Sequence, residues 1–135
     1  MGCAQGIRVA AVSGLYETEP EGVVRQPCFM NAAVKIRTRL SPLKLLEICN
    51  RIEKKLGRKR VGKWGPRTID LDVVLFGGRV IRSADLNVPH PLMHQRRFVL
   101  APLAEIAKGA VHPVLRARIS TLLSRLKSGK KVRKT

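Results

Sequence analysis

The segment at residues 67–76, Arg-Thr-Ile-Asp-Leu-Asp-Val-Val-Leu-Phe, constrains the fold more than any other part of the chain. Its apolar and β-branched residues, followed by Gly77 and Gly78, predict a strand that ends in a turn. Because successive side chains on a strand alternate between its faces, we expect Asp70 and Asp72 on one face, roughly 6.5 to 7 Å apart along the chain. The apolar residues between them are then expected to face a core.

The acidic pair favours a cation site. Two neighbouring carboxylates repel each other unless a cation lies between them. Magnesium takes oxygen ligands, typically one or two carboxylates together with substrate phosphates. Only 9 of the 135 residues are acidic while 27 are basic, so two acids on one strand are conspicuous. The alternative is a solvated strand face that happens to carry Asp70 and Asp72. We interpret the pair as ligands of the magnesium of a nucleotide.

Cationic side chains flank the acidic pair on both sides. The planar guanidinium of arginine suits phosphate oxygens, and several cations around a dication fit a polyphosphate better than a single carboxylate. For any one of these residues the alternative is an ordinary solvated surface charge. The flanking residues are Arg58, Lys59, Arg60, Lys63, Arg67, His90, His94, Arg96 and Arg97.

Other residues near the basic segment need separate interpretation. Residues 57–63 have the spacing of a P-loop, but Trp64 stands where Ser or Thr must bind magnesium. The segment also lies between a helix and a strand, the reverse of the order that a P-loop needs, so we reject this motif. Trp64 is either a core residue or a platform for a flat ring. Phe29 and Asn31 share one face of a predicted strand and are a candidate recognition pair for a flat heterocycle that forms hydrogen bonds.

Periodicity along the rest of the chain predicts both strands and helices. Ser41 is a candidate N-cap with Pro42 at the first helical position, and Gly57 is expected to end this helix. The other predicted elements are strands at residues 7–18 and 29–38, a short strand at residues 80–81 that pairs back across the glycine turn, a helix at residues 93–105 and an amphipathic segment at residues 119–126.

Composition limits the class of protein. A chain of 135 residues is expected to form one domain, which we place at residues 1–126. Residues 127–135 carry five basic residues and are expected to be a disordered tail. The 44% of hydrophobic residues and the mean hydropathy of −0.06 are typical of a soluble protein, and no apolar run is long enough to span a membrane. Three widely spaced cysteines without a CxxC pair predict a reduced, cytoplasmic protein.

The net charge of +18 implies an anionic partner, a basic tail or both. Nucleic acid is one such partner, and it would bind with an affinity that falls steeply with salt and does not depend on Asp70 or Asp72. Only 4% of the residues are aromatic, which argues against the base-stacking surfaces of single-strand binders. We therefore expect that the chain does not act on nucleic acid, and keep this class as an alternative.

One long segment resembles a known enzyme family. Residues 60–76, with Trp-Gly-Pro-Arg-Thr-Ile-Asp-Leu-Asp at their centre, are similar to the signature of 6-hydroxymethyl-7,8-dihydropterin pyrophosphokinase (2-amino-4-hydroxy-6-hydroxymethyldihydropteridine diphosphokinase), an enzyme of folate biosynthesis. The resemblance covers roughly residues 7–115. Supporting matches lie at residues 15–20, 29–34, 88–91 and 96–100.

The resemblance implies a fold and a reaction. The family's fold is an α+β, ferredoxin-like sandwich, in which helices pack on an antiparallel sheet. Its enzymes transfer the diphosphate of ATP to the hydroxymethyl group of the pterin and release AMP. Two Mg²⁺ ions are the implied cofactors, ATP and the pterin are the implied partners, and a monomer is expected. The family's N-terminal strand, Gly-Ser-Asn loop and first helix have no counterpart here, so we expect an N-terminally truncated sheet.

The resemblance also implies roles for individual residues. Asp70 and Asp72 would hold the magnesium ions. The implied catalytic residues are Arg58, Arg60 and Arg67. The implied ATP contacts are Arg67, Val73, His90 and Arg96. The implied pterin contacts are Thr18, Phe29, Asn31, Trp64 and Phe98, of which the two phenylalanines would sandwich the ring. No general base is required, because phosphoryl transfer depends mostly on positioning and charge neutralisation.

An alternative within the same family is an inactive remnant. A chain without the family's first strand would leave neighbouring strands short of ladder partners. Such a remnant would keep the signature residues and fold poorly, and a cooperative thermal transition would argue against it.

Overall fold

The described part of the chain forms two compact units. The computed structural model describes residues 6–18, 29–59, 70–126 and 132–135. The first unit comprises Met1–Arg39 and Pro91–Thr135, and the second comprises Leu40–His90. Elements of the first unit are β1 (Ile7–Val12), β2 (Tyr16–Thr18), β3 (Phe29–Asn31), β4 (Val34–Thr38), the 3-10 helix η1 (Met93–Gln95), α2 (Arg97–Ala107), α3 (Ile119–Arg125) and β7 (Val132–Lys134). Elements of the second unit are α1 (Pro42–Lys59), β5 (Ile81–Arg82) and β6 (Asn87–Val88).

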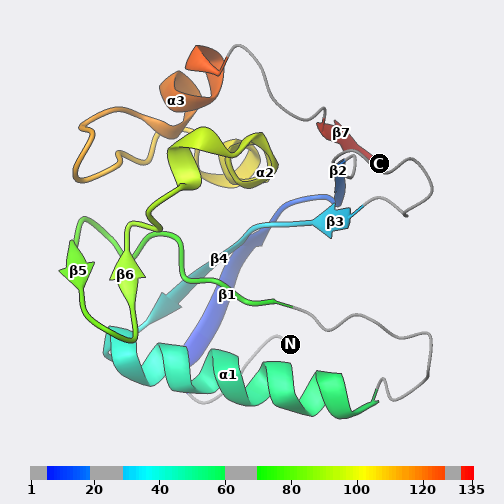
Figure 1. Cartoon of the computed structure of the whole chain (residues 1–135), viewed down its shortest axis with the longest axis vertical. Coiled ribbons are helices and arrows are strands. Elements are labelled where there is room, and N and C mark those ends of the chain that lie inside the picture. The colour runs from blue at the N-terminus through cyan, green and yellow to red at the C-terminus, as the bar shows by residue number, and fades with distance from the viewer. Residues whose placement is uncertain (1–5, 19–28, 60–69, 127–131) are drawn as a thin grey trace. The chain divides into compact units, whose positions relative to one another are not determined.

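All of the paired strands in the described residues are antiparallel. In the first unit β1 pairs with β4, and β2 lies between β3 and β7 (Figure 1). Helix α2 packs against β2, β3 and β4, and also against α3. Small antiparallel sheets together with α-helices, of which α2 packs on the strands of its own unit, confirm the predicted α+β class.

The two long strands predicted at residues 7–18 and 29–38 are each broken in two. At the break, the Ser13 backbone N–H donates to the Ala33 carbonyl at 2.9 Å, and the Ala33 N–H donates to Ser13 Oγ at 2.8 Å. The buried Ser13 hydroxyl thus replaces a ladder bond where the strands bend. As a result, β1 pairs with β4, whereas β2 pairs with β3. The two strands were predicted at the correct positions, but the prediction that each is continuous was wrong.

The core of the first unit is made by its helices. Met93 of η1, Leu100 of α2 and Ile119 of α3 are each 0% exposed. The predicted helix at residues 93–105 divides at Arg96, whose extended backbone separates η1 from α2. The predicted amphipathic segment at residues 119–126 is confirmed as α3.

His112 is a buried polar group in the loop before α3. Its Nδ1 accepts the backbone N–H groups of Val114, at 3.2 Å, and Leu115, at 3.0 Å. These two donors require an unprotonated Nδ1. Burial lowers the pKa of His112, and the edge-on ring of His94, with its centroid 6.3 Å away, lowers it further. The neutral imidazole is therefore the form that stabilises this loop.

We expect the folded chain to lose stability as the pH falls from 7.5 to 5. The pKa of His112 is lower in the folded than in the unfolded chain, so the unfolded chain takes up the proton first. The contribution of the neutral ring is complete above the ordinary value of 6.5, and it is lost as the pH falls through the folded pKa. Thermal melts of wild type and His112→Asn across this range test the prediction, because the asparagine oxygen accepts the same amides without titrating. Equal pH dependence in both proteins would contradict it.

The C-terminal segment differs from its prediction. Residues 127–135 were expected to be disordered, but Val132–Lys134 form β7, which pairs with β2. The prediction of disorder is therefore wrong for this strand, and residues 127–131 lie outside the described part. Whether the domain boundary falls at residue 126 stays a prediction.

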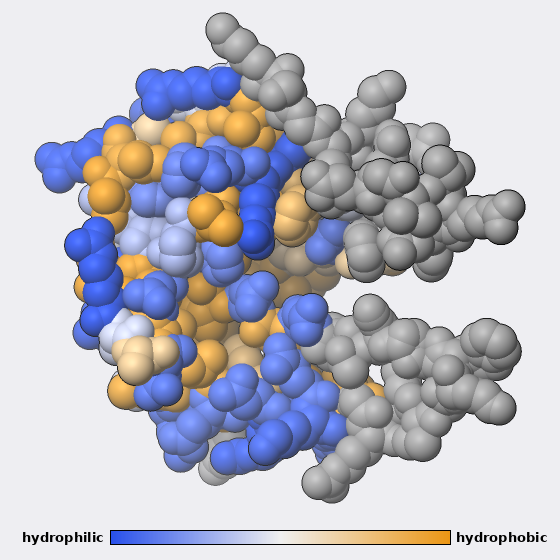
Figure 2. Space-filling model, in the orientation of Figure 1, coloured by the Kyte–Doolittle hydropathy of each residue, from blue (hydrophilic) through white to orange (hydrophobic). Residues whose placement is uncertain are grey.

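Helix α1 begins as predicted and continues further than predicted. The Lys44 N–H donates to Ser41 Oγ at 3.2 Å, which confirms Ser41 as the N-cap. The helix runs through Gly57 to Lys59, so the predicted end is wrong. A glycine within a helix costs only about 1 kcal/mol, which the rest of this long helix can offset. Figure 2 shows hydrophilic side chains along α1, at the bottom of the view, in agreement with its exposed Lys44 and Lys54.

The strand predicted at residues 67–76 is absent from its described part. Residues 70–76 make no ladder, and the glycine pair does end the segment in a turn, with the Arg79 N–H donating to the Phe76 carbonyl at 3.0 Å. The predicted pairing of residues 80–81 back across this turn is also wrong, since β5 pairs with β6. An extended segment is assigned as a strand only where a neighbour supplies ladder bonds, and residues 70–76 find side-chain and isolated backbone partners instead. In the described residues no helix is long and apolar enough to cross a membrane.

Candidate functional site

The acidic pair keeps its predicted exposure although its segment is not a strand. Asp70 and Asp72 are exposed, while Leu71 and Val73 are half-buried. The backbone N–H of Leu71, between the two acids, donates to Glu53 Oε2 on α1. This bond ties the segment to a helix and holds the two carboxylates on its solvent side. Exposure therefore alternates over residues 70–73, as predicted, although these residues form no strand ladder.

Glu53 was not among the residues predicted for the site. It is half-buried and accepts the Leu71 amide. The sequence does contain a signal for this half-buried position. Cys49 and Ile52 belong to the stripe of apolar residues on α1, and Glu53 follows Cys49 by four residues and Ile52 by one. Residues four apart share a helix face, so Glu53 borders the stripe that packs inward.

The pKa of the Cys49 thiol depends on carboxylates of the same region. Burial raises the pKa of Cys49, and the carboxylates of Glu53 and Asp72 raise it further because the thiolate would add a third negative charge. Asp72 thus lies close enough to α1 for its charge to reach Cys49.

Replacing Asp72 by asparagine is expected to lower the pKa of Cys49 toward 9.0 while leaving it raised, because burial is unchanged. At a fixed pH near 8 the thiolate fraction of Cys49 should increase, because removing a nearby negative charge favours the charged thiolate. The measurement is the rate of alkylation by iodoacetamide with a chelator present, in a Cys3→Ser/Cys28→Ser background. Glu47→Gln, at an exposed position of α1, is the matched control. An unchanged rate in Asp72→Asn would mean that Asp72 does not face the thiol.

The acidic pair is suited to a magnesium ion that takes some of its ligands from the protein and the others from a substrate. The described residues contain no group of three or more His, Cys, Asp or Glu placed to hold a metal ion. Magnesium, however, is usually bound by one or two carboxylates and completes its shell with phosphates and water. Two exposed carboxylates on an anchored segment meet that requirement. Asp70 and Asp72 would hold the ion, with Glu53 already engaged by a backbone amide.

The other predicted residues of the second unit are only partly described. Val73 and His90 are half-buried, and the His90 N–H donates to the Val74 carbonyl at 2.9 Å, which brings their two segments together. Arg58 lies in the last turn of α1. Three predicted residues lie outside the described part of the chain: Arg60, Trp64 and Arg67.

The first unit brings two predicted pterin contacts together. Thr18 ends β2 and is 2% exposed, and Asn31 ends β3. Asn31 Nδ2 donates to Thr18 Oγ1 at 2.9 Å. This bond uses one amide donor of Asn31 and one lone pair of the Thr18 hydroxyl. Asn31 Oδ1 can therefore still accept a hydrogen bond, and the Thr18 O–H can still donate one. Phe29 pairs with Thr18 in the β2–β3 ladder.

Two more predicted residues meet at the start of α2. The Arg96 guanidinium carbon lies 5.6 Å from the centroid of the Phe98 ring, within the range of a cation–π interaction. Arg96 is the residue before α2, and Phe98 is in its first turn. A flat aromatic ring and a planar cation are therefore held next to each other at a helix N-terminus.

The fold and these residues define an α+β protein with an exposed acidic pair in one unit and a hydrogen-bonded polar pair, Thr18 and Asn31, in the other. The family model for 7,8-dihydro-6-hydroxymethylpterin-pyrophosphokinase (HPPK) matches residues 2–108. The chain belongs to this family. The resemblance noted from the signature residues is thereby confirmed.

Individual relatives agree with the family match. The 2-amino-4-hydroxy-6-hydroxymethyldihydropteridine pyrophosphokinase of Bacillus subtilis (strain 168) is 52% identical over 102 residues, which are 76% of this chain and 61% of that protein. The enzyme of the same name from Haemophilus influenzae is 47% identical over 105 residues, or 78% of this chain and 66% of that protein. The folic acid synthesis protein fol1 of Schizosaccharomyces pombe is 44% identical over 92% of this chain and 17% of its own length. The chain thus spans just under two thirds of the first two relatives.

Proposed function

We propose that the chain transfers the β,γ-diphosphate of ATP to the hydroxymethyl group of 6-hydroxymethyl-7,8-dihydropterin and releases AMP, as a step of folate biosynthesis. Relatives that are 40–52% identical to this chain and are named 2-amino-4-hydroxy-6-hydroxymethyldihydropteridine pyrophosphokinase support this activity. The observation that carries the proposal in the structure is the exposed Asp70–Asp72 pair, anchored through the Leu71 amide to Glu53. The odd number of cysteines accords with action in the cytoplasm, and a monomer is the proposed state.

The acidic pair is proposed to hold two Mg²⁺ ions. When bound, the ions would neutralise charge on the ATP phosphates and orient the pterin hydroxyl for in-line displacement. Asp70 and Asp72 supply hard oxygen ligands on one exposed side of their segment. Glu53 fixes the backbone between them, so little ordering remains to be done when the ligands bind.

Arginine and histidine side chains, together with Val73, are proposed to bind ATP. The proposed contacts are Arg67, Val73, His90 and Arg96, with Arg58, Arg60 and Arg67 stabilising the charge that develops during transfer. Phosphoryl transfer requires mainly positioning and charge neutralisation, so no side chain is assigned as a general base.

Thr18 and Asn31 are proposed to bind the pterin by its hydrogen-bonding edge. Their mutual bond leaves one acceptor and one donor free, and a pterin edge offers both kinds of group. Phe98 is proposed to stack on the ring, with Phe29 and Trp64 as further contacts. Arg96, beside Phe98, would link this part of the pocket to a phosphate.

The test is pterin-dependent formation of AMP by the purified 135-residue chain with ATP and Mg²⁺. Activity is expected only when hydroxymethyldihydropterin is present, and a pterin without the hydroxyl group should support none. AMP release that does not depend on the pterin would refute the proposed acceptor. A chain that binds a non-hydrolysable ATP analogue and the pterin without turnover would instead be an inactive member of the family.

A further inference from the structure

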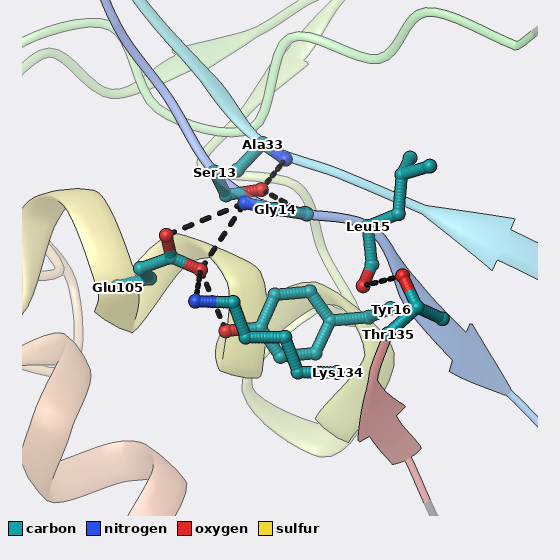
Figure 3. Close-up of polar contacts among 8 residues, drawn as sticks. All are labelled: Ser13, Gly14, Leu15, Tyr16, Ala33, Glu105, Lys134 and Thr135. Carbon is teal, nitrogen blue, oxygen red and sulfur yellow. Dashed lines mark hydrogen bonds and ion pairs between the residues drawn. The ribbon is translucent and has the colours of Figure 1, made fainter.

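Glu105 of α2 joins two segments that lie far apart in the sequence, residues 14–16 and the C-terminal strand β7. Its two carboxylate oxygens accept the Gly14 N–H at 3.2 and 3.3 Å, and Oε1 accepts the Tyr16 O–H at 2.8 Å. Lys134 Nζ lies 3.3 Å from the same Oε1 (Figure 3). One carboxylate therefore connects the link between β1 and β2, β2 itself and the C-terminal strand β7.

Strand β7 completes the three-stranded sheet around β2. Tyr16 pairs with Lys134, and Thr18 pairs with Val132. Beyond the strand, the Thr135 backbone N–H and hydroxyl both donate to the Leu15 carbonyl, at 2.9 and 3.1 Å. Without β7, the backbone groups on this edge of β2 would face water. A strand of three residues held from one side only is marginal, so β7 should contribute strongly to the order of β2.

The order of β2 determines where the Thr18 hydroxyl lies. Thr18 is the last residue of β2, and it receives the Asn31 amide from β3 on the side opposite β7. Val132 and Phe29 flank Thr18 as its partners in the two ladders. A shift of β2 by one residue would move the hydroxyl to the other face of the sheet.

Gly14 is adapted to the close approach of Lys134. A Cβ built on Gly14 would lie 2.8 Å from Lys134 Cε, closer than real Cβ contacts. The lysine stem thus runs directly over the glycine backbone to reach Glu105 (Figure 3). Any larger residue at this position would displace the lysine side chain.

The electrostatics favour the ionised form of Glu105 and the protonated form of the Tyr16 hydroxyl. The Tyr16 hydroxyl, the Gly14 amide and Lys134 together hold the pKa of Glu105 below its usual value. Burial, and then Glu105 itself, raises the pKa of Tyr16. Hydrogen bonds to an ionised acceptor are stronger than neutral ones, and the bond from the Tyr16 hydroxyl, at 2.8 Å, is the shortest that Glu105 accepts.

We propose that Glu105 and β7 form a clamp that fixes β2 and thereby positions the Thr18–Asn31 pair for the pterin. Glu105 and Lys134 are positioning residues in this inference, which rests on the proposed function. The clamp makes the C-terminal residues part of the substrate site although they do not touch the substrate.

The first test needs no substrate. Amide hydrogen exchange of residues 16–18 and the side-chain amide signal of Asn31 are followed by NMR in wild type, Glu105→Gln, Lys134→Met and a chain ending at residue 131. Exchange should accelerate about tenfold or more in Glu105→Gln and in the shortened chain, because charge-assisted bonds are lost. Lys134→Met and Gly14→Ala should show smaller effects, and Lys134→Arg should restore the wild-type rate. Glu47→Gln and Lys108→Met, both at exposed positions, are the matched controls.

The second test separates positioning from general stability. In Glu105→Gln the KM for the pterin is expected to rise about tenfold while the KM for ATP stays unchanged. Lys134→Arg should keep the wild-type KM for the pterin, since the positive charge is retained.

Either of two results would overturn the clamp. Unchanged exchange of residues 16–18 in Glu105→Gln and in the shortened chain would show that the clamp does not fix β2. If the KM values for the pterin and for ATP rose equally while the melting temperature fell, Glu105 would contribute to general stability and would not specifically position the Thr18–Asn31 pair. A wild-type chain that binds no pterin would refute the proposed function, whereas the exchange data would still decide whether the clamp holds the Thr18–Asn31 pair.

Discussion

Replacing Asp70 and Asp72 together by asparagine is expected to lower pterin-dependent AMP release by about 10³-fold or more, and to abolish magnesium-dependent binding of an ATP analogue. Removing a single preorganised electrostatic group typically costs a factor of about 10² to 10³, and here two carboxylate ligands are lost. Asparagine keeps the shape and polarity of each side chain, and both acids are exposed, so folding should be little affected. The measurements are the initial rate of AMP formation and calorimetric titration with and without Mg²⁺.

Glu47→Gln provides the control for the acidic pair. It makes the same carboxylate-to-amide change at an exposed position on α1, where Glu47 forms an ion pair with the exposed Lys44 at 3.6 Å. An exposed ion pair of this kind contributes little to stability, so wild-type activity and affinity are expected. If the double asparagine variant bound the ATP analogue as tightly as wild type in the presence of Mg²⁺, the metal assignment would be refuted.

Asn31→Leu is expected to weaken pterin binding by about 10- to 100-fold while leaving the affinity for the ATP analogue unchanged. Leucine is similar in size but removes both the bond to Thr18 and the free amide oxygen. The buried Thr18 hydroxyl is then left without its donor, and a substrate group that needs an acceptor finds none. Fluorescence titration with the pterin and calorimetry with the ATP analogue measure the two affinities separately.

Asn50→Leu is the matched control, because Asn50 is an exposed residue of α1. It should bind both ligands as wild type does. Equal loss of both affinities in Asn31→Leu would point to a folding defect, and an unchanged pterin affinity would remove Asn31 from the recognition pair.

Much of the fold was predictable where local rules apply. The N-cap at Ser41 and the amphipathic segment that became α3 depend on capping and helical periodicity, and both are confirmed. The glycine turn after Phe76 is confirmed for the same reason. The breaks in the two long strands were not predictable, since they depend on the hydroxyl of Ser13 meeting a backbone amide twenty residues away.

The residues proposed for the site were mostly found from the sequence, but the residues that support them were not. The signature segment, with Asp70 and Asp72, is local and specific. Glu53 and Glu105 are distant in sequence from the groups they hold, and charged residues on helices usually face water. Their roles became visible only through contacts with backbone amides and a tyrosine hydroxyl.

By itself the sequence determined the α+β class, the family signature and the alternation that exposes Asp70 and Asp72, because each depends on residues close together in the chain. The tertiary structure alone decided what holds these residues. The segment of the acidic pair is anchored by Glu53 rather than by a strand ladder, and the basic C-terminal segment, expected to be disordered, pairs with β2 as β7. Both outcomes have the same physical cause: a backbone amide or a charged side chain takes whichever partner the fold brings near, and local sequence does not specify that partner.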